Sequence, residues 1–185
     1  MREGNEVTMN RRFTKRVYVL LGFSVLFFIL MMTFFNKGKA VDGSLVQSEL
    51  YSSLGGLFLG LFALSFLATI TFIARKRFWK ILTIIVMVLF LFATLQEMRY
   101  VLLLTDDKSL YEKGEFETYI GTPDEVKYDH DSYVFEIIFS ERTFKVHHLE
   151  ISQTSYEENF KGNEIEIQYL PNSKLPISVE ASNSK

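Results

Sequence analysis

Long apolar runs dominate the first part of the chain. Residues 17–35 contain no charged side chain, and residues 54–74 and 81–95 form two further apolar runs. A helix rises about 1.5 Å per residue, so about 20 apolar residues cross a hydrocarbon core of roughly 30 Å. We therefore expect three transmembrane helices, at residues 17–35, 54–74 and 80–104, with a polar loop at 36–53.

The pattern becomes alternating after Thr105, and the sequence Asp106-Asp107-Lys108 is expected to break the last long helix. Alternation of apolar and polar residues indicates half-buried strands. It predicts five of them, at residues 116–120, 132–140, 143–150, 164–170 and 176–180. A capping-box pattern beginning at Ser155 and the glycine at 162 predict a short helix at 156–161.

The core face of the second predicted strand is expected to hold Tyr133, Phe135, Ile137 and Phe139. His148 is a candidate for the core face of the next strand. Three strands, a helix and two strands follow the order of an OB-like barrel, with an SH3-like barrel as the alternative. The predicted fold class is therefore membrane α plus all-β, and residues Val101–Leu104 are expected to dock on the small barrel.

The segment Gly162-Asn163-Glu164-Ile165-Glu166-Ile167-Gln168-Tyr169-Leu170-Pro171 carries a glycine, a polar residue, alternating apolar residues and a proline. It resembles a signature in the C-terminal barrel of small uncharacterised bacterial membrane proteins, and NfeD-like proteins share this broad architecture. The resemblance extends over residues 133–180. It implies a fold and a membrane setting, but no activity, and no catalytic residue can be transferred from it.

Charge divides the chain at the same place as hydropathy. Residues 1–104 hold 12 Lys or Arg and 5 Asp or Glu, a net charge of +7, whereas residues 105–185 hold 8 and 17, a net charge of −9. We therefore expect a basic N-terminal segment at 1–16, a helical region at 17–104 and a separate β domain at 105–185. The β domain is large enough for one small core.

Basic residues predict the membrane topology. They cluster in residues 1–16 and in the turn Arg75-Lys76-Arg77-Phe78-Trp79-Lys80. Short segments rich in Lys and Arg stay in the cytoplasm. The prediction is a multi-pass protein of the cell membrane with a cytoplasmic N-terminus and an extracytoplasmic β domain. A cleaved signal peptide ending near Gly38-Lys39-Ala40 is the alternative for the first helix.

Two groups of residues in the helices are candidate sites. Gly56, Gly60 and Ala63 form a small-residue face, which lets helices approach closely, either within this chain or between two copies. Gln96, Glu97 and Arg99 are expected near the outer interface. There they form either a helix-end anchor or an interhelical proton or ion site.

Several chemistries are disfavoured by the residue types. The absence of cysteine excludes disulfides and thiolate chemistry. His147 and His148 are neighbours on a predicted strand and should face opposite ways, while Asp129-His130-Asp131 is expected to form a hairpin tip. We therefore expect no metal and no cofactor. No serine lies in a strand-to-helix elbow, and the negative β domain should repel nucleic acid.

These observations favour a non-enzymatic membrane protein whose acidic β domain serves as an interaction or accessory module of the cell envelope. Its expected partners are the lipid bilayer and another membrane or envelope protein, or a second copy of itself. The alternative is a transport-type or immunity-type protein that acts through its helices, at Gln96, Glu97 and Arg99. An envelope hydrolase would need converging polar groups in a pocket of the barrel.

Overall fold

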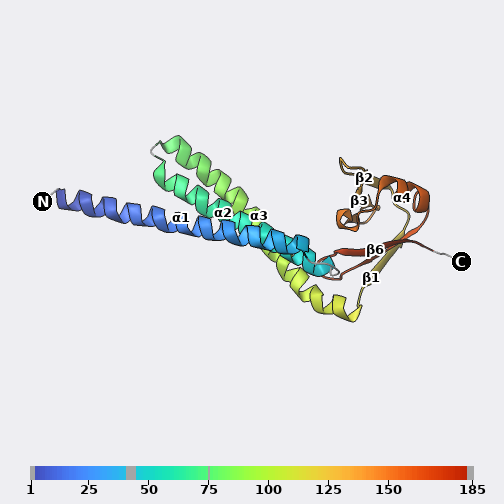
Figure 1. Cartoon of the computed structure of the whole chain (residues 1–185). Coiled ribbons are helices and arrows are strands. Elements are labelled where there is room, and N and C mark those ends of the chain that lie inside the picture. Colours follow the sequence, from blue (N-terminus) through green and yellow to red (C-terminus); the bar gives the residue numbers. More distant parts are fainter. Residues whose placement is uncertain (1–2, 41–44, 75, 183–185) are drawn as a thin grey trace. The chain divides into compact units, whose positions relative to one another are not determined.

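A computed structural model describes residues 3–40, 45–74 and 76–182, with side chains from Thr14 onward. The chain forms two compact units, Met1–Leu102 and Leu103–Lys185. The first is helical and the second is mostly β-structure (Figure 1). We refer to them as the helical unit and the β-rich unit.

Three long helices are present, α1 (Glu3–Ala40), α2 (Leu45–Ile73) and α3 (Arg77–Lys113). Each contains a stretch long and apolar enough to span a membrane. The helix α1 lies beside α2, and α2 forms a hairpin with α3 (Figure 1). The three predicted helices are therefore present, although all are longer than the apolar runs alone indicated.

The predicted polar loop at 36–53 is wrong, since residues 36–40 and 45–53 are helical and residues 41–44 lie outside the described part of the chain. Contacts between α1 and α2 explain the extension. The Ser48 hydroxyl donates to the Gly38 carbonyl at 2.8 Å, and the rings of Phe34 and Tyr51 pack with centroids 6.2 Å apart. The second helix thus begins at Leu45 rather than at residue 54. Of the basic turn, Arg75 lies outside the described residues, and residues 77–80 already belong to α3.

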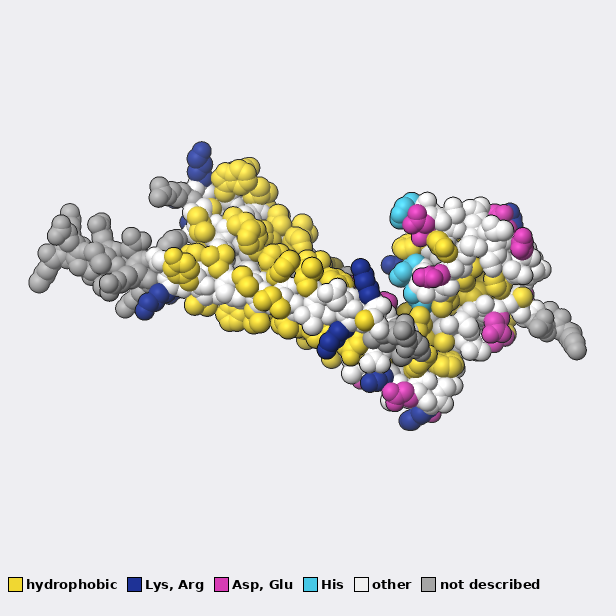
Figure 2. Space-filling view, viewed as in Figure 1, with side chains coloured by type: hydrophobic (Ala, Val, Ile, Leu, Met, Phe, Trp, Pro, Cys, Tyr) yellow, Lys and Arg dark blue, Asp and Glu magenta, His cyan; other side chains and the backbone are white. Residues whose placement is uncertain are grey.

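The helical unit buries small and polar side chains and exposes large apolar ones. Its buried residues include Ser24, Ser53, Gly60, Thr69 and Thr94. Hydrophobic side chains cover the visible face of the helices in Figure 2. A helical bundle in water would show the opposite pattern, whereas small residues inside and apolar residues outside are typical of helices packed in lipid.

The predicted helix break at residues 106–108 is also wrong, because α3 continues to Lys113. The helix ends in a Schellman motif at Gly114, whose φ is 72°. The amide of Glu115 donates to the Leu110 carbonyl and that of Gly114 to the Tyr111 carbonyl. Glycine adopts this left-handed conformation without the strain of a side chain.

The β-rich unit contains six strands in two antiparallel sheets, ordered β1-β5-β6 and β2-β3-β4. The prediction of five strands missed β2. The two antiparallel sheets agree with a small β-structure. That they close into an OB-like or SH3-like barrel stays a prediction. The strands and short helices are β1 (Glu117–Gly121), β2 (Glu125–Tyr128), β3 (Val134–Ile138), β4 (Thr143–Lys145), the 3-10 helix η1 (His147–Leu149), α4 (Gln153–Asn159), β5 (Ile165–Tyr169) and β6 (Pro176–Ala181).

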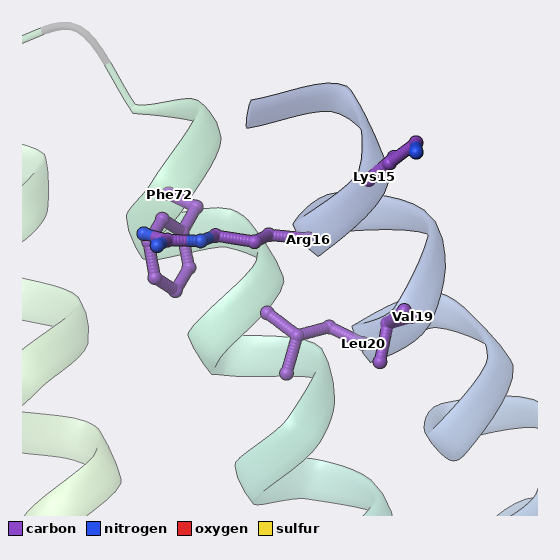
Figure 3. A pocket seen from close by; sticks show the side chains of 5 residues that line it. All are labelled: Lys15, Arg16, Val19, Leu20 and Phe72. Atoms are coloured by element: carbon purple, nitrogen blue, oxygen red, sulfur yellow. The ribbon is translucent and has the colours of Figure 1, made fainter. Parts of the chain in front are cut away.

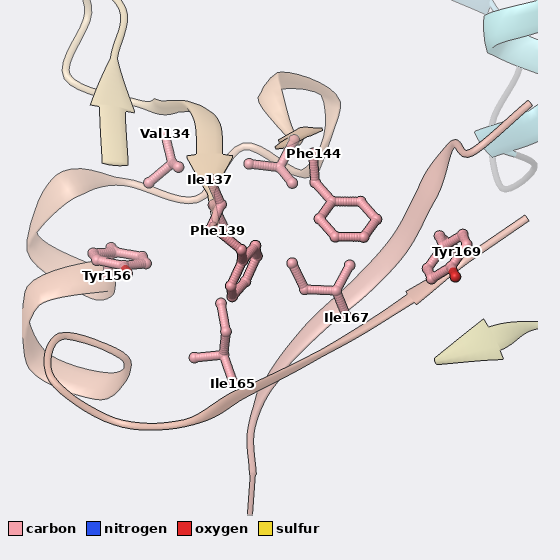
Figure 4. Packing of buried hydrophobic residues seen from close by; sticks show 9 residues of the cluster. Val134, Ile137, Phe139, Phe144, Tyr156, Ile165, Ile167 and Tyr169 are labelled. Atoms are coloured by element: carbon pink, nitrogen blue, oxygen red, sulfur yellow. The ribbon is translucent and has the colours of Figure 1, made fainter. Parts of the chain in front are cut away.

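One hydrophobic core joins the two sheets (Figure 4). Strand β5 follows the predicted alternation, with Ile165, Ile167 and Tyr169 buried. The helix α4 covers the core with Tyr156. The remaining core side chains come from β3, β4 and the segments that follow them, namely Val134, Ile137, Phe139, Phe144 and Val146.

The predicted core face of the second strand is wrong in its first half. The pairing of β2 with β3 shifts between Lys127, which pairs with Glu136, and Tyr128, which pairs with Val134. This β-bulge leaves Phe135 without an opposite residue. Val134 is therefore fully buried, while Phe135 is 38% and Tyr133 40% exposed. Beyond the bulge, Ile137 and Phe139 are buried as predicted.

The segment after β4 also differs from the prediction. The strand ends at Lys145, and His148 lies in η1 rather than on a strand face. The cap of α4 is Ser152, whose hydroxyl accepts from the Ser155 amide, so the helix begins earlier than predicted. Gly162 follows α4 with a φ of 79°, in agreement with its predicted role after the helix.

Candidate functional site

The small-residue face of α2 lies against α3 of the same chain. A Cβ at Gly60 would overlap the Thr94 side chain, and a Cβ at Gly56 would lie 3.5 Å from the Glu97 carboxyl group. Ala63, the third predicted residue of this face, is half-buried. The glycines therefore allow the two helices to approach closely, as packing within the helical unit requires.

The three predicted polar residues of α3 do not converge. Glu97 is half-buried on the side that faces Gly56, whereas Gln96 and Arg99 are exposed. Glu49 on α2 lies close enough to Glu97 for the two carboxylates to repel each other. Only Glu97 of the three thus lies where an interhelical site would be.

Hydroxyl groups link the helices elsewhere. The Ser24 hydroxyl lies 2.8 Å from that of Ser65, which joins α1 to α2. The Thr71 hydroxyl donates to that of Thr83 at 2.8 Å, which joins α2 to α3. A backbone carbonyl of the same helix also lies within hydrogen-bond distance of each hydroxyl, so each donates its one hydrogen either to that carbonyl or to the neighbouring helix. They satisfy polar groups inside the helical unit and leave no free donor for a ligand.

A groove lies between the first part of α1 and the last turn of α2. Its volume is about 360 Å³, and Lys15, Arg16, Val19, Leu20 and Phe72 line it (Figure 3). Two side chains of the lining are cationic and three are apolar. The sequence could not indicate this groove, because it depends on which helix α1 packs against.

A cluster of cations and aromatic rings joins the two sheets of the β-rich unit. The Arg142 guanidinium lies 5.7, 5.8 and 5.2 Å from the ring centroids of Tyr119, Phe144 and Tyr169. It also donates a hydrogen bond to the Tyr169 hydroxyl. Because Arg142 follows β3 while Tyr169 ends β5, this contact fastens one sheet to the other.

An ion pair lies beside that cluster. The Lys174 ammonium is 3.0 Å from a Glu117 carboxylate oxygen and 5.2 Å from the Tyr169 ring centroid. The hydrogen bond from Lys174 holds the pKa of Glu117 below its usual value, with a further contribution from the Tyr169 hydroxyl. Since both charged side chains are about half exposed, this pair adds little stability.

Asp107 forms a hydrogen-bond clamp that sequence reasoning missed. The residue is fully buried. Its Oδ1 accepts from the Asn172 amide at 3.1 Å and side chain at 2.8 Å, and its Oδ2 accepts from the Ser173 amide at 2.6 Å and hydroxyl at 2.5 Å. Four donors compensate the burial of the carboxylate. The clamp ties the last part of α3 to the turn between β5 and β6.

The bulge in β3 creates an exposed aromatic patch on the β-rich unit. Phe135 packs against the His147 ring, with centroids 5.8 Å apart, and Tyr133 is exposed two residues earlier. We call these three residues the β3 patch. An acidic group adjoins it at one end, since the Asp129 carboxylate accepts from the Tyr133 amide.

The histidines lie in three different settings. His130 pairs with Asp131 at 3.1 Å, His147 packs on Phe135, and His148 Nε2 lies 2.7 Å from the Pro176 carbonyl. Asp129 accepts the amides of Asp131 and Tyr133, as expected of a hairpin tip. Within the described residues, no group of three or more His, Asp or Glu side chains could hold a metal ion.

Comparisons with protein-family models, with curated proteins and with solved structures gave no match. The resemblance to NfeD-like proteins therefore stays a prediction.

Proposed function

We propose that this chain is a non-enzymatic, three-span protein of the cell membrane whose β-rich unit is an interaction module of the cell envelope. The β3 patch is its docking surface. The partner is another envelope protein or a second copy of this chain. The observation that carries the proposal is the bulge, which turns the Phe135 side chain from the core to the surface.

The bulge points to a function because exposing the Phe135 side chain costs the protein stability. Exposing an aromatic side chain gives up stabilisation of roughly 1.5–3 kcal/mol that burial would provide. Bulges often serve to redirect a side chain at functional positions. Aromatic side chains are also common at the centres of protein interfaces, where they fill pockets on the partner.

The negative charge of the β domain indicates what kind of surface the partner presents. The β domain carries a net charge of −9, and the Asp129 carboxylate adjoins the β3 patch. A partner with an apolar pocket and a basic rim would complement this surface. Opposite charges at the rim mainly speed association and exclude wrong partners.

A photo-crosslinking amino acid at position 135 tests the proposal in intact cells. We expect one defined cross-linked species from this position. Introduction of the same amino acid at Glu180, an exposed position on β6, is the control and should not give that species. A second substitution, His147→Glu, should weaken the cross-link from position 135. Identical products from both positions, or none from position 135, would contradict the docking role.

A second candidate function lies in the helices. Glu97 is half-buried beside Gly56, with Glu49 nearby. Carboxylates that face the interior of a helical bundle are candidates for proton or ion sites. If the protein is of the transport or immunity type, Glu97→Gln should abolish its cellular phenotype and removal of residues 114–185 should spare it. The docking proposal expects the opposite pattern.

A further inference from the structure

We propose that the groove between α1 and α2 binds an anionic phospholipid of the cytoplasmic leaflet. The lipid phosphate lies at Lys15 and Arg16, and an acyl chain lies along Val19, Leu20 and Phe72. This inference rests on the proposed membrane placement of the helices, but not on the docking role of the β-rich unit.

The shape and chemistry of the groove fit the junction between headgroup and acyl chain. Its volume is about 360 Å³. On α1 the two cations are followed by Val19 and Leu20, and α2 contributes Phe72 (Figure 3). The two cations lie on α1 directly before the uncharged run of residues 17–35. They therefore lie at headgroup depth, and the apolar side chains follow one turn deeper.

The charges of the groove are uncompensated among the described side chains. Neither Lys15 nor Arg16 forms an ion pair with a described carboxylate. The two described acids of the helical unit, Glu49 and Glu97, belong to its opposite end. Glu97 lies 20 residues along α3 from Arg77, a separation of roughly 30 Å. An external anion is thus the natural counter-charge.

Further cations lie at the same end. Phe72 is in the last turn of α2, Lys76 lies in the turn that follows, and Arg77 and Lys80 lie at the start of α3. Basic pockets between transmembrane helices on the cytoplasmic side are suited to anionic headgroups, and each nearby cation favours an anionic lipid by about 1 kcal/mol. Neutral lipids lack this contribution, so the groove should be selective for lipid charge.

Native mass spectrometry of the full chain in detergent tests the inference. The probes are phosphatidylglycerol and phosphatidylcholine with the same acyl chains. We expect the apparent affinity for phosphatidylglycerol to exceed that for phosphatidylcholine by about thirtyfold, because two cations each contribute a factor of about five. The water-soluble headgroup glycerophosphate should not compete, since it lacks the acyl chain.

Matched variants locate the site. Lys15→Gln with Arg16→Gln should lower the affinity for phosphatidylglycerol by about thirtyfold and leave that for phosphatidylcholine unchanged. The control, Lys37→Gln with Lys39→Gln, removes the same charge from the other end of α1 and should have no such effect. Phe72→Ala should weaken the binding of both lipids.

Three outcomes would overturn the inference: equal affinity for the two lipids, equal loss in both double variants, or competition by glycerophosphate as strong as that by the lipid. The last would indicate an anion site without an acyl-chain groove. Cross-linking from position 135 does not depend on this groove, so failure of the lipid site and failure of the docking role can be told apart.

Discussion

The Asp107 carboxylate links the end of α3 to the β5–β6 turn through hydrogen bonds. It is fully buried and accepts four hydrogen bonds, two from Asn172 and two from Ser173. Hydrogen bonds to a charged group contribute more than neutral ones, and removal of the acceptor leaves buried donors unsatisfied. The turn sequence Pro171-Asn172-Ser173-Lys174 therefore has a role beyond reversing the chain.

Asp107→Ala should destabilise the β-rich unit by about 3 kcal/mol, because the amides of Asn172 and Ser173 lose their acceptor inside the protein. Hydrogen exchange of the full chain in detergent measures this directly, since both amides should exchange much faster in the variant. The neighbouring exposed residue gives the control, Asp106→Ala, which should leave their protection unchanged. Equal protection in Asp107→Ala and the wild type would mean that the clamp does not form.

At the scale of elements, the bulge in β3 buries one side chain and exposes the next one along the strand. Val134 is fully buried and Phe135 is 38% exposed. Val134→Ser should cost about 3 kcal/mol through a cavity and a buried hydroxyl, while Phe135→Ser should cost less than about 1 kcal/mol. Pulse proteolysis of the full chain in urea would measure both. Simple alternation predicts the reverse order, which would refute the bulge.

The small-residue face of α2 gives a second prediction at this scale. The chain lacks cysteine, so introduced cysteines report contacts without background. Because Gly56 faces Glu97, Gly56→Cys with Glu97→Cys should oxidise to a bond within one chain. Gly56→Cys alone should stay monomeric on a non-reducing gel. A covalent dimer from the single variant would instead favour homodimerisation through this face.

The elements that sequence reasoning found are those whose pattern is local. The three apolar runs predicted membrane-length helices, and the alternation of Ile165, Ile167 and Tyr169 predicted β5 and its buried face. Both signals arise from the residues of the element itself. They needed no knowledge of which partner the element packs against.

The errors arose where contacts distant in sequence decide the structure. The helix α3 passes through residues 106–108 because Asp107 bonds residues 65 and 66 positions away. The exposure of Phe135 depends on how β3 pairs with β2, which a periodic pattern cannot reveal. The short strand β2 offers only Val126 and Tyr128 as inward positions. The β3 patch and the basic groove were therefore beyond sequence reasoning.

At the scale of the whole molecule, the groove strengthens the argument for membrane topology. Lys15 and Arg16 of α1 lie beside Phe72, near the end of α2 that leads into the basic turn. The two basic clusters of the sequence thus belong to the same end of the helical unit. Short basic segments stay in the cytoplasm. Because both basic clusters belong to one end, a single orientation of the helices keeps the two of them in the cytoplasm.

That arrangement leads to a prediction about the C-terminal half. On the proposed topology, three crossings from a cytoplasmic N-terminus would carry residues 103–185 to the outer surface. A cysteine in place of Asp131, at the exposed tip before β3, should react with a membrane-impermeant maleimide in intact cells. A cysteine in place of Lys76 should react only after permeabilisation, because the proposed topology puts the turn between α2 and α3 in the cytoplasm. Labelling of Lys76→Cys but not of Asp131→Cys in intact cells would invert the topology: the lipid groove would then face the outer leaflet, and the β3 patch could meet only cytoplasmic partners.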